Sequence, residues 1–289
     1  MKITVFGATG VVGRALLPLL ASDHELVAVS RSAQAAETRV SWVEGDATSA
    51  DDVMRAVEGA EVVYYLVHSL GRPDFERQDR VAADTVAVAC EHAGVKQIVY
   101  LGGLGDDDPE ASPHLRSRQE TGERLSAGGV PVTTLRAAMI VGEGSAAFET
   151  IVALVDRLPA MITPTWVSTP TQPIALADIS RYLAGVCGNQ GAFGESFDAG
   201  GPELMTYRQM MERIALLRGR RPLILEVPIL TPRLSSLWLH LVTPVDASVA
   251  RPLIEGLKNP TIAREERLRT LVPFGLTSFD DAARRAFTR

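Results

Sequence analysis

Short apolar runs alternate with amphipathic segments along the first half of the chain. The runs have the length of buried strands, and in the segments between them apolar residues recur every three or four positions, as on one face of a helix. Buried strands that alternate with amphipathic helices indicate a parallel sheet covered on both faces. We predict strands at residues 2–6, 25–30, 40–45, 61–67, 97–102 and 132–137, and helices at residues 11–22, 49–58, 74–93 and 114–127.

The alternation loosens after residue 140, where residues 156–174 contain four prolines and little regular period. Right-handed crossovers between the early strands give a doubly wound α/β fold. We therefore expect a core over residues 1–140, with residues 141–289 as a smaller C-terminal α/β lobe that is interleaved with the core and lies over its cleft. The elements predicted in this lobe are helices at 147–158, 176–187 and 206–219, with Gly219 as the stop of the last, and a strand at 222–228.

The composition fits a folded protein in a reducing compartment. The chain has 289 residues, of which 46% are apolar, and a net charge of −6 without a basic block, so nucleic acid is not an expected partner. Only Cys90 and Cys187 occur, which is too few for a disulfide framework, and no signal peptide is visible, so we expect a cytoplasmic location. The histidines show no metal-ligand spacing with cysteine or carboxylate, so we expect no metal site.

Residues 223–257 form the most apolar long stretch of the chain. Four prolines and the charged residues Arg233, Asp246 and Arg251 interrupt it. A membrane-spanning helix needs about 20 unbroken apolar residues. We therefore expect a folded lobe with an apolar surface here, and no membrane span.

A glycine-rich turn, "GATGVVG", follows the first predicted strand and opens the first helix. Its glycines let the chain turn sharply and let a pyrophosphate approach the backbone, and the helix N-terminus adds unpaired N–H groups and a partial positive charge. Strand, turn and helix together are the context that a dinucleotide-binding motif requires, so residues 1–140 are predicted to bind a dinucleotide. The alternative is a tight turn without a ligand. The expected cofactor contacts in the turn are Gly7, Thr9, Gly10, Val11, Val12 and Gly13.

The spacing of these glycines resembles that of the short-chain dehydrogenase/reductase superfamily, in its extended and atypical branches. The segments "GDAT" (45–48), "LRAAMIVGEGS" (135–145) and "PIALADIS" (173–180) resemble further parts of that superfamily. The chain as a whole most resembles the NmrA-like group, which binds dinucleotides and often lacks the usual active site. The resemblance implies a Rossmann fold, with Asp46 at the adenine amino group and Ala47 against the adenine ring.

The end of the second predicted strand bears on which dinucleotide is bound. An acidic residue here suits the ribose 2′-hydroxyl of NAD, and a basic residue suits the 2′-phosphate of NADP. The chain has Ser30, Arg31 and Ser32 here, and no acid before Glu37. Because Arg31 can form a charge-assisted pair with phosphate and the serines can donate to it, we expect NADP(H) to be preferred over NAD(H). The alternative is an ordinary solvated arginine.

The positions of the usual active site carry other residues. Active members of the superfamily have a serine after the fifth strand and Tyr-x-x-x-Lys on the next helix. In this chain a glycine pair beginning at Gly102, itself an expected cofactor contact, replaces the serine, while His114 replaces the tyrosine and Arg118 the lysine. His114 could act as an acid near neutral pH, and Arg118 could hold ribose or phosphate. Alternatively, Ser112 caps the helix, Pro113 is its first residue and His114 is exposed.

A second candidate lies at the end of the fourth predicted strand. Leu66, Val67 and His68 reach the sheet edge where ligands bind in open α/β folds, and we expect them to contact the cofactor. His68 and Ser69 could donate to a substrate oxygen. The alternative is a histidine that caps the following helix.

Two further groups lie near the predicted cleft. The segment "GDDDPE" (105–110) contains three aspartates that could bind a cation, although a solvated loop is the favoured interpretation. Phe148, Met161 and Trp166 could wall a pocket for an apolar or bulky ligand, or could belong to the core.

These residues favour an NADP(H)-dependent oxidoreductase with atypical catalytic residues, which transfers a hydride to or from an apolar or bulky organic substrate. His114, Arg118 and His68 are its candidate catalytic residues. The alternative is a non-catalytic NADP(H)-binding redox sensor, or an assembly or regulatory protein with a protein partner, which the missing serine, tyrosine and lysine support. An epimerase or dehydratase is less favoured, because those reactions normally use the tyrosine.

Overall fold

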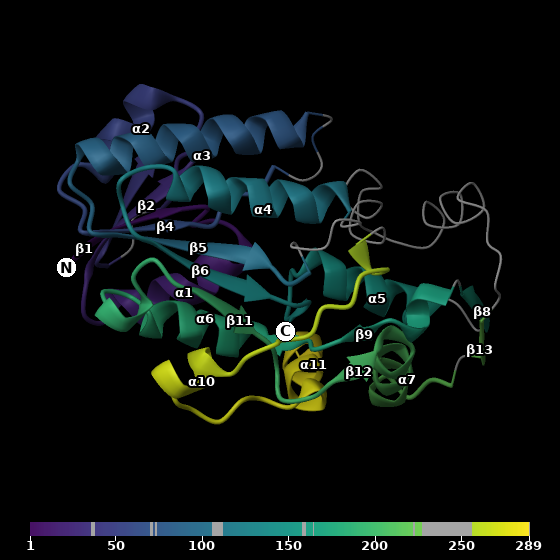
Figure 1. Cartoon of the computed structure of the whole chain (residues 1–289). Helices are drawn as coiled ribbons and strands as arrows, with labels where there is room; N and C mark the ends of the chain where they lie inside the picture. Colours follow the sequence, from purple (N-terminus) through teal and green to yellow (C-terminus); the bar gives the residue numbers. More distant parts are fainter. Residues whose placement is uncertain are drawn as a thin grey trace.

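The computed structural model places seven strands in one sheet, in the order β11-β6-β5-β4-β1-β2-β3 (Figure 1). Each neighbouring pair is parallel, and the strand order reverses at β1, which confirms the predicted doubly wound Rossmann-type fold. The strands are β1 (Lys2–Phe6), β2 (Glu25–Ser30), β3 (Val40–Glu44), β4 (Val62–Tyr65), β5 (Gln97–Gly103), β6 (Val132–Ala137) and β11 (Ser196–Ala199). The structure describes residues 1–35, 38–69, 72, 74–105, 112–157, 160–163, 165–221, 223–226 and 256–288.

Helices cover both faces of this sheet (Figure 1). On one face, α2, α3 and α4 bury apolar side chains such as Val53, Val86 and Leu125 against the strands. On the other face, α1 and α6 pack together and bury Leu16 and Leu183. The bounds are α1 (Val11–Ala21), α2 (Ala50–Val57), α3 (Phe75–His92), α4 (Pro113–Ser126) and α6 (Leu176–Gly185).

The second half of the chain adds β11 to the main sheet beside β6 and builds three two-stranded ladders. Three helices pack around an apolar cluster of their own, which contains Phe148, Met211 and Ile214. The helices are α5 (Ala146–Arg157), α7 (Tyr207–Leu217) and α11 (Phe279–Phe287), with α10 (Arg267–Leu271) nearby in the chain. The ladders pair β7 (Ile140–Val141) with β10 (Ile174–Ala175), β9 (Pro170–Thr171) with β12 (Met205–Thr206), and β8 (Ala160–Thr163) with β13 (Leu223–Glu226).

The ends of α7 follow from local chemistry that is visible in the sequence. Thr206 accepts a hydrogen bond from the backbone N–H of Gln209, whose side chain accepts one from the N–H of Thr206, so the two form a capping box. After the helix, Gly219 takes a φ of +68°, which glycine adopts without the Cβ penalty. The predicted stop at Gly219 is therefore confirmed.

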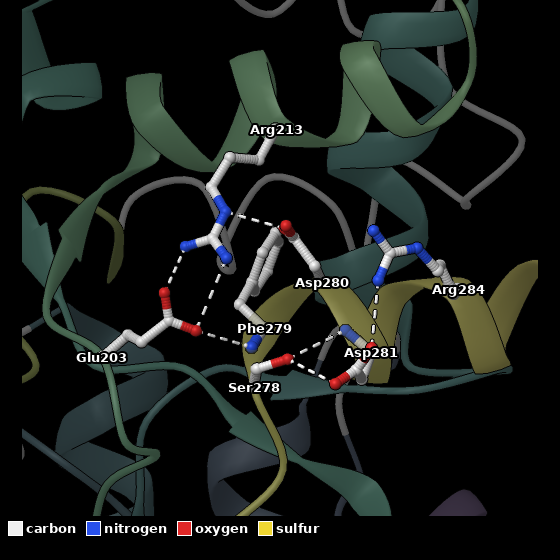
Figure 2. A network of polar contacts seen from close by, with 7 residues as sticks. All are labelled: Glu203, Arg213, Ser278, Phe279, Asp280, Asp281 and Arg284. Atoms are coloured by element: carbon white, nitrogen blue, oxygen red, sulfur yellow. Dashed lines mark hydrogen bonds and ion pairs between the residues drawn. The ribbon is translucent and has the colours of Figure 1, made fainter.

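The C-terminal helix α11 is fastened by a polar network that the sequence analysis did not anticipate (Figure 2). Arg213 of α7 donates from Nε to Asp280 Oδ1 at 2.7 Å and pairs with Glu203 through Nη1. Glu203 also accepts the backbone N–H of Phe279 at 2.8 Å. One guanidinium thus joins the loop before β12 to the first turn of α11.

The apolar stretch at residues 223–257 lies largely outside the described residues. Its first part forms β13, which agrees with the strand predicted at 222–228. Among the helices of the described ranges, none combines the length and apolar character that a bilayer crossing requires.

Candidate functional site

The glycine turn is tightly packed against the end of β4. Gly7 has a φ of +82°, and a Cβ there would lie 2.6 Å from the carbonyl oxygen of Leu66. A Cβ on Gly13 would likewise clash with the backbone of Gly7 and Ala8. Gly10 is the N-cap of α1 and has no side chain that could accept from the first N–H groups. These groups and the positive end of the helix dipole therefore remain available to an anion such as pyrophosphate.

A cavity of about 360 Å³ lies beside this turn, at the carboxyl ends of β1, β2, β3 and β4. Most of the predicted cofactor contacts line it, namely Gly7, Thr9, Gly10, Ser30, Arg31, Asp46, Ala47, Leu66, Val67 and His68. The predicted residues that do not line it are Val11, Val12, Gly13, Ser32, Gly102, His114 and Arg118. Tertiary structure therefore gathers four separate strand ends around one space.

The outer part of this cavity carries two arginines and one carboxylate. Arg31 and Arg72 are exposed cations on its lining, and Asp46 is the acid among them. The backbone N–H of Thr48 donates to Asp46 Oδ1 and lowers the pKa of this carboxyl against the opposing effect of burial, with smaller contributions from the Thr48 hydroxyl and the two arginines. The ionised Asp46 can accept a hydrogen bond from a nucleobase, and the arginines can pair with phosphate.

One histidine of the cavity lining, His68, packs against a second histidine behind it. The ring of His68 lies 4.8 Å from that of His114 between centroids, with the planes 30° apart. Burial lowers the pKa of His68, against the raising effect of Asp79. Burial, together with the charges of His68 and Arg118, lowers the pKa of His114 well below its usual value. Both imidazoles are therefore neutral near pH 7.

The helix that carries His114 begins as the sequence predicts. Ser112 caps it by accepting from the N–H of Leu115, and Pro113 is its first residue. The alternative in which His114 is exposed is wrong, because its side chain is partly buried against His68 and its Nδ1 has no partner within the described residues. Ser112 therefore caps this helix, and His114 on its first turn is partly buried at the same time.

Arg118 contacts the end of β5. Its Nη2 donates to the carbonyl oxygen of Leu101, and its guanidinium lies 5.2 Å from the ring centre of Tyr100. The hydroxyl of Tyr100 in turn donates to the carbonyl of Arg118 at 2.7 Å. Arg118 is thus held beside β5 by two side-chain contacts.

The glycine pair at the end of β5 leaves the serine position without a hydroxyl. A Cβ on Gly102 would meet only ordinary contacts, the nearest at 3.4 Å from Tyr100. A Cβ on Gly103 would lie 3.1 Å from Leu115. Side-chain bulk is therefore tolerated better at Gly102 than at Gly103.

A second and larger cavity, of about 810 Å³, opens on the other side of the turn. It shares Thr9 with the first cavity and has Val11 and Arg14 of α1 in its lining, opposite Arg285 of α11. Its remaining lining residues are Ala15 of α1, residues 141–144 at the end of β7 and after it, residues 175–177 at the start of α6, and residues 277, 282, 286 and 288. The N-terminus of α1 therefore borders both cavities, since Gly10 lines the first and Val11 the second.

Some of the bulky or acidic candidates do not contribute to either cavity. Phe148 is buried in the core and stacks on Phe287 at 6.0 Å, and Trp166 packs edge-on against Tyr207 at 5.9 Å. The core interpretation therefore holds for both. The aspartates of the 105–110 segment and the side chain of Met161 lie outside the described residues. No group of three possible metal ligands occurs in the described part of the chain.

Three residues that help to form the site were not predicted from the sequence: Asp79, Ser117 and Arg72. Asp79 lies on the buried face of α3, in register with Ala82, Ala83 and Val86. An acid within an apolar helical stripe is a signal that was available in the sequence. Ser117 is the corresponding buried polar residue on α4, whereas Arg72 lies in a loop where no periodicity marks it.

Comparisons with known proteins agree with this site. Residues 7–150 match the model of a family described as NAD(P)H-binding. The chain is 26% identical over 225 residues to a (4-alkanoyl-5-oxo-2,5-dihydrofuran-3-yl)methyl phosphate reductase of Streptomyces griseus, covering 75% of this chain and 74% of that protein.

Solved structures share the fold over the whole chain. An NADPH-dependent quinone oxidoreductase from Escherichia coli, complexed with NADPH, has a TM-score of 0.80 at 19% identity and covers 100% of both chains. A triphenylmethane reductase of Citrobacter sp., complexed with NADP(H), has a TM-score of 0.78 at 18% identity and covers 99% of this chain and 100% of that chain.

Proposed function

We propose that this chain, which belongs to the NAD(P)H-binding family, is an NADP(H)-dependent oxidoreductase that transfers a hydride to or from a bulky organic carbonyl compound or its alcohol. The observation that carries the proposal is that His68 lines the same cavity as the glycine turn and Arg31. In this proposal the cofactor and a proton-transferring side chain share one space. This is the arrangement that dinucleotide-dependent reduction needs.

The fit to a dinucleotide rests on the chain's own residues. The α1 N-terminus and the cradle at Gly7 suit pyrophosphate, and Asp46 with Ala47 suits adenine. Arg31 and Arg72 suit a 2′-phosphate, because two cations on the cavity lining, with no acid at the end of β2, favour the additional negative charge of NADP(H). Two of the similar solved structures hold NADPH or NADP(H), which supports the same preference.

The chemistry of the protein in this proposal is proton transfer and orientation. When bound, the cofactor supplies or accepts the hydride. In the reducing direction, the carbonyl oxygen takes a proton from the imidazolium form of His68 or His114, which is a minor form near pH 7 because burial lowers both pKa values, and the imidazole then regains a proton from solvent. Arg118 orients the neighbouring end of β5 through its hydrogen bond to the carbonyl oxygen of Leu101.

The substrate class follows from the relatives and the space available. The Streptomyces relative is named for an alkanoyl-oxo-dihydrofuranyl compound and the Escherichia coli protein for quinones, both of which carry carbonyl groups conjugated or attached to rings. The cavity of about 810 Å³ beside the turn has room for a molecule of that size, but His68 lines the cavity of about 360 Å³, so the reacting carbonyl group has to enter that smaller cavity. We propose a cyclic, unsaturated carbonyl compound as the substrate.

A binding and turnover experiment tests this proposal. Calorimetric titration should show NADPH binding at least about tenfold tighter than NADH. A panel of quinones and unsaturated lactones should then oxidise NADPH, and His68→Asn should lower that rate at saturating NADPH, where a weaker cofactor contact no longer limits the rate. His92→Asn, on the exposed end of α3, is the matched control. Equal affinity for the two cofactors would contradict the NADP(H) assignment, and absence of turnover across the panel would contradict the oxidoreductase.

A non-catalytic NADP(H)-binding regulator is the second candidate. The glycines at the end of β5 remove the usual hydroxyl, and a donor of Arg118 is already engaged by Leu101. Tight NADPH binding without turnover, together with a partner protein that prefers the loaded form, is the outcome that would favour it.

A further inference from the structure

Asp79 is a buried carboxylate that joins three parts of the site. Its side chain is 4% exposed. Oδ1 accepts the backbone N–H of Ser69 at 2.9 Å, while Oδ2 lies 3.3 Å from His68 Nδ1 and accepts the hydroxyl of Ser117 at 3.2 Å. Within the described residues, His68 is its one ion-pair partner. The loop after β4, α3 and α4 therefore converge on this one carboxylate.

These contacts keep Asp79 ionised despite its burial. Burial alone would raise the pKa of Asp79, but the hydrogen bonds from His68 and Ser69 outweigh it and leave the pKa below its usual value. An ionised carboxylate has only acceptors, so the contact with His68 requires the proton of the imidazole to be on Nδ1. In neutral His68 the lone pair is then on Nε2.

The other nitrogen of His68 is without a partner. Nε2 is buried and finds no hydrogen-bond partner within the described residues, and the same holds for Nδ1 of the adjacent His114. An unpaired buried nitrogen costs about 1–3 kcal/mol, which a polar ligand group would recover. The charged groups around His68 are Asp79 of α3, and His114 and Arg118 of α4.

We propose that Asp79 is the positioning residue of this site, because its carboxylate fixes the Nδ1–H tautomer of His68 and so makes Nε2 the atom that exchanges a proton with the substrate oxygen. The proposal rests on the proposed function for the identity of that oxygen. In the reducing direction, the imidazolium form of His68 gives its Nε2 proton to the carbonyl oxygen as the hydride reaches the carbonyl carbon. With a bound NADPH as the source of the hydride, the carbonyl would become an alcohol and His68 would return to the neutral Nδ1–H form.

Nuclear magnetic resonance of the imidazole nitrogens tests this role without any substrate. In protein labelled with ¹⁵N on its histidines, long-range ¹H–¹⁵N spectra should show His68 with Nδ1 protonated and Nε2 unprotonated above its pKa. Asp79→Asn should abolish the fixed tautomer and lower the pKa of His68 further, because the negative charge that favours the imidazolium is gone. Asp84→Asn, an exposed acid on the same helix that pairs with Arg124, should change neither.

Two results would overturn the role of Asp79. One is a wild-type His68 protonated on Nε2, a measurement that does not depend on the stability of any variant. The other is a folded Asp79→Asn protein whose His68 tautomer and pKa are unchanged. Ser117→Ala, which keeps the carboxylate, should retain the Nδ1–H tautomer.

Turnover separates this inference from the proposed function. With menadione as the probe, Asp79→Asn should lower the rate of NADPH oxidation by at least about tenfold and change its pH profile, with NADPH affinity retained. If the wild-type protein oxidises no NADPH with any probe, the proposed function fails whatever the spectra show. If turnover is present and Asp79→Asn shifts the tautomer without slowing it, Nε2 of His68 is not the proton-exchanging atom.

Discussion

His68 and His114 face each other with their ring centroids 4.8 Å apart, although one follows a strand and the other lies on the first turn of a helix. Burial lowers the pKa of both, and the charge of His68 adds to this effect at His114. Two imidazolium ions in such contact would repel each other. The pair therefore carries at most one positive charge easily, and this has consequences for both stability and reaction.

Acidification is expected to destabilise the protein through His114. A histidine whose folded pKa is lowered leaves the unfolded state binding more protons, so stability is full above the unfolded pKa of about 6.5 and is lost as the pH falls below it. Each such group contributes a slope of at most about 1.4 kcal/mol per pH unit. Urea unfolding between about pH 7 and pH 5 should show this slope. His114→Asn should flatten it and the exposed His92→Asn should not; an equal slope in all three proteins would refute the assignment.

Arg31 is expected to select the 2′-phosphate. Arg31→Ala should weaken NADPH binding by about 10- to 100-fold, since a charge-assisted hydrogen bond to phosphate is worth about 1.5–3 kcal/mol, and should leave NADH binding nearly unchanged. Titration calorimetry at two salt concentrations would measure this. Arg55→Ala is the control, because Arg55 is an exposed arginine of α2 that pairs with Asp52 and does not line the cavity. Equal losses for the two cofactors would point to a role other than phosphate selection.

Gly7 is expected to tolerate no side chain, because a Cβ would lie too close to the carbonyl oxygen of Leu66 and because its φ is positive. Gly94 has a similar positive φ of +69°, but a Cβ at that position would meet no other atom within 4 Å, so Gly94→Ala should cost only about 1 kcal/mol of backbone strain. Gly7→Ala adds the clash with the Leu66 carbonyl and should destabilise more and abolish NADPH binding. Thermal unfolding with and without NADPH compares them. Similar losses for the two variants would show that the contact with β4 is unimportant.

The ion pairs of Arg213 are expected to contribute more to the stability of α11 in its place than an ordinary surface pair does (Figure 2). Arg213→Ala leaves Glu203 and Asp280 without their shared cation and should lower the free energy of unfolding by about 1–2 kcal/mol, a range already reduced for partial exposure. Arg284→Ala, which removes an exposed pair with Asp281, should cost less than about 0.5 kcal/mol. Denaturant unfolding measures both, and equal losses for the two variants would show that the network adds nothing beyond an ordinary surface pair.

The same network predicts a second loss of stability on acidification, which comes from a carboxylate and not from a histidine. Arg213 holds the pKa of Glu203 below its usual value, so the stabilisation is present above the unfolded pKa and is lost as the pH falls through the folded pKa. In Glu203→Gln this loss at acidic pH should disappear, while the loss through His114 at higher pH remains. Unfolding curves that stay superimposable with those of the wild type at every pH would exclude the contribution of Glu203.

The predicted elements of the first half agree with the structure to within two residues, because most of these strands are short segments rich in apolar and β-branched residues and each helix has an apolar stripe. The strand β11 was not predicted, because it is only four residues long and contains the charged Asp198, which is not typical of a buried strand. That charge is satisfied only in the folded chain, where Arg136 of β6 pairs with it. Ladders of two residues, such as β7 with β10, carry no periodicity at all.

The sequence by itself determined the doubly wound fold and the glycine turn, because periodicity, a strand-to-helix glycine cluster and a basic strand end are all local signals. Only the tertiary structure decided that Asp79, His68 and His114 meet, since they come from three different segments and touch because α3 and α4 pack on one face of the sheet. Their protonation depends on burial and on one another's charges. Those are properties of neighbours in space, which the order of residues along the chain does not contain.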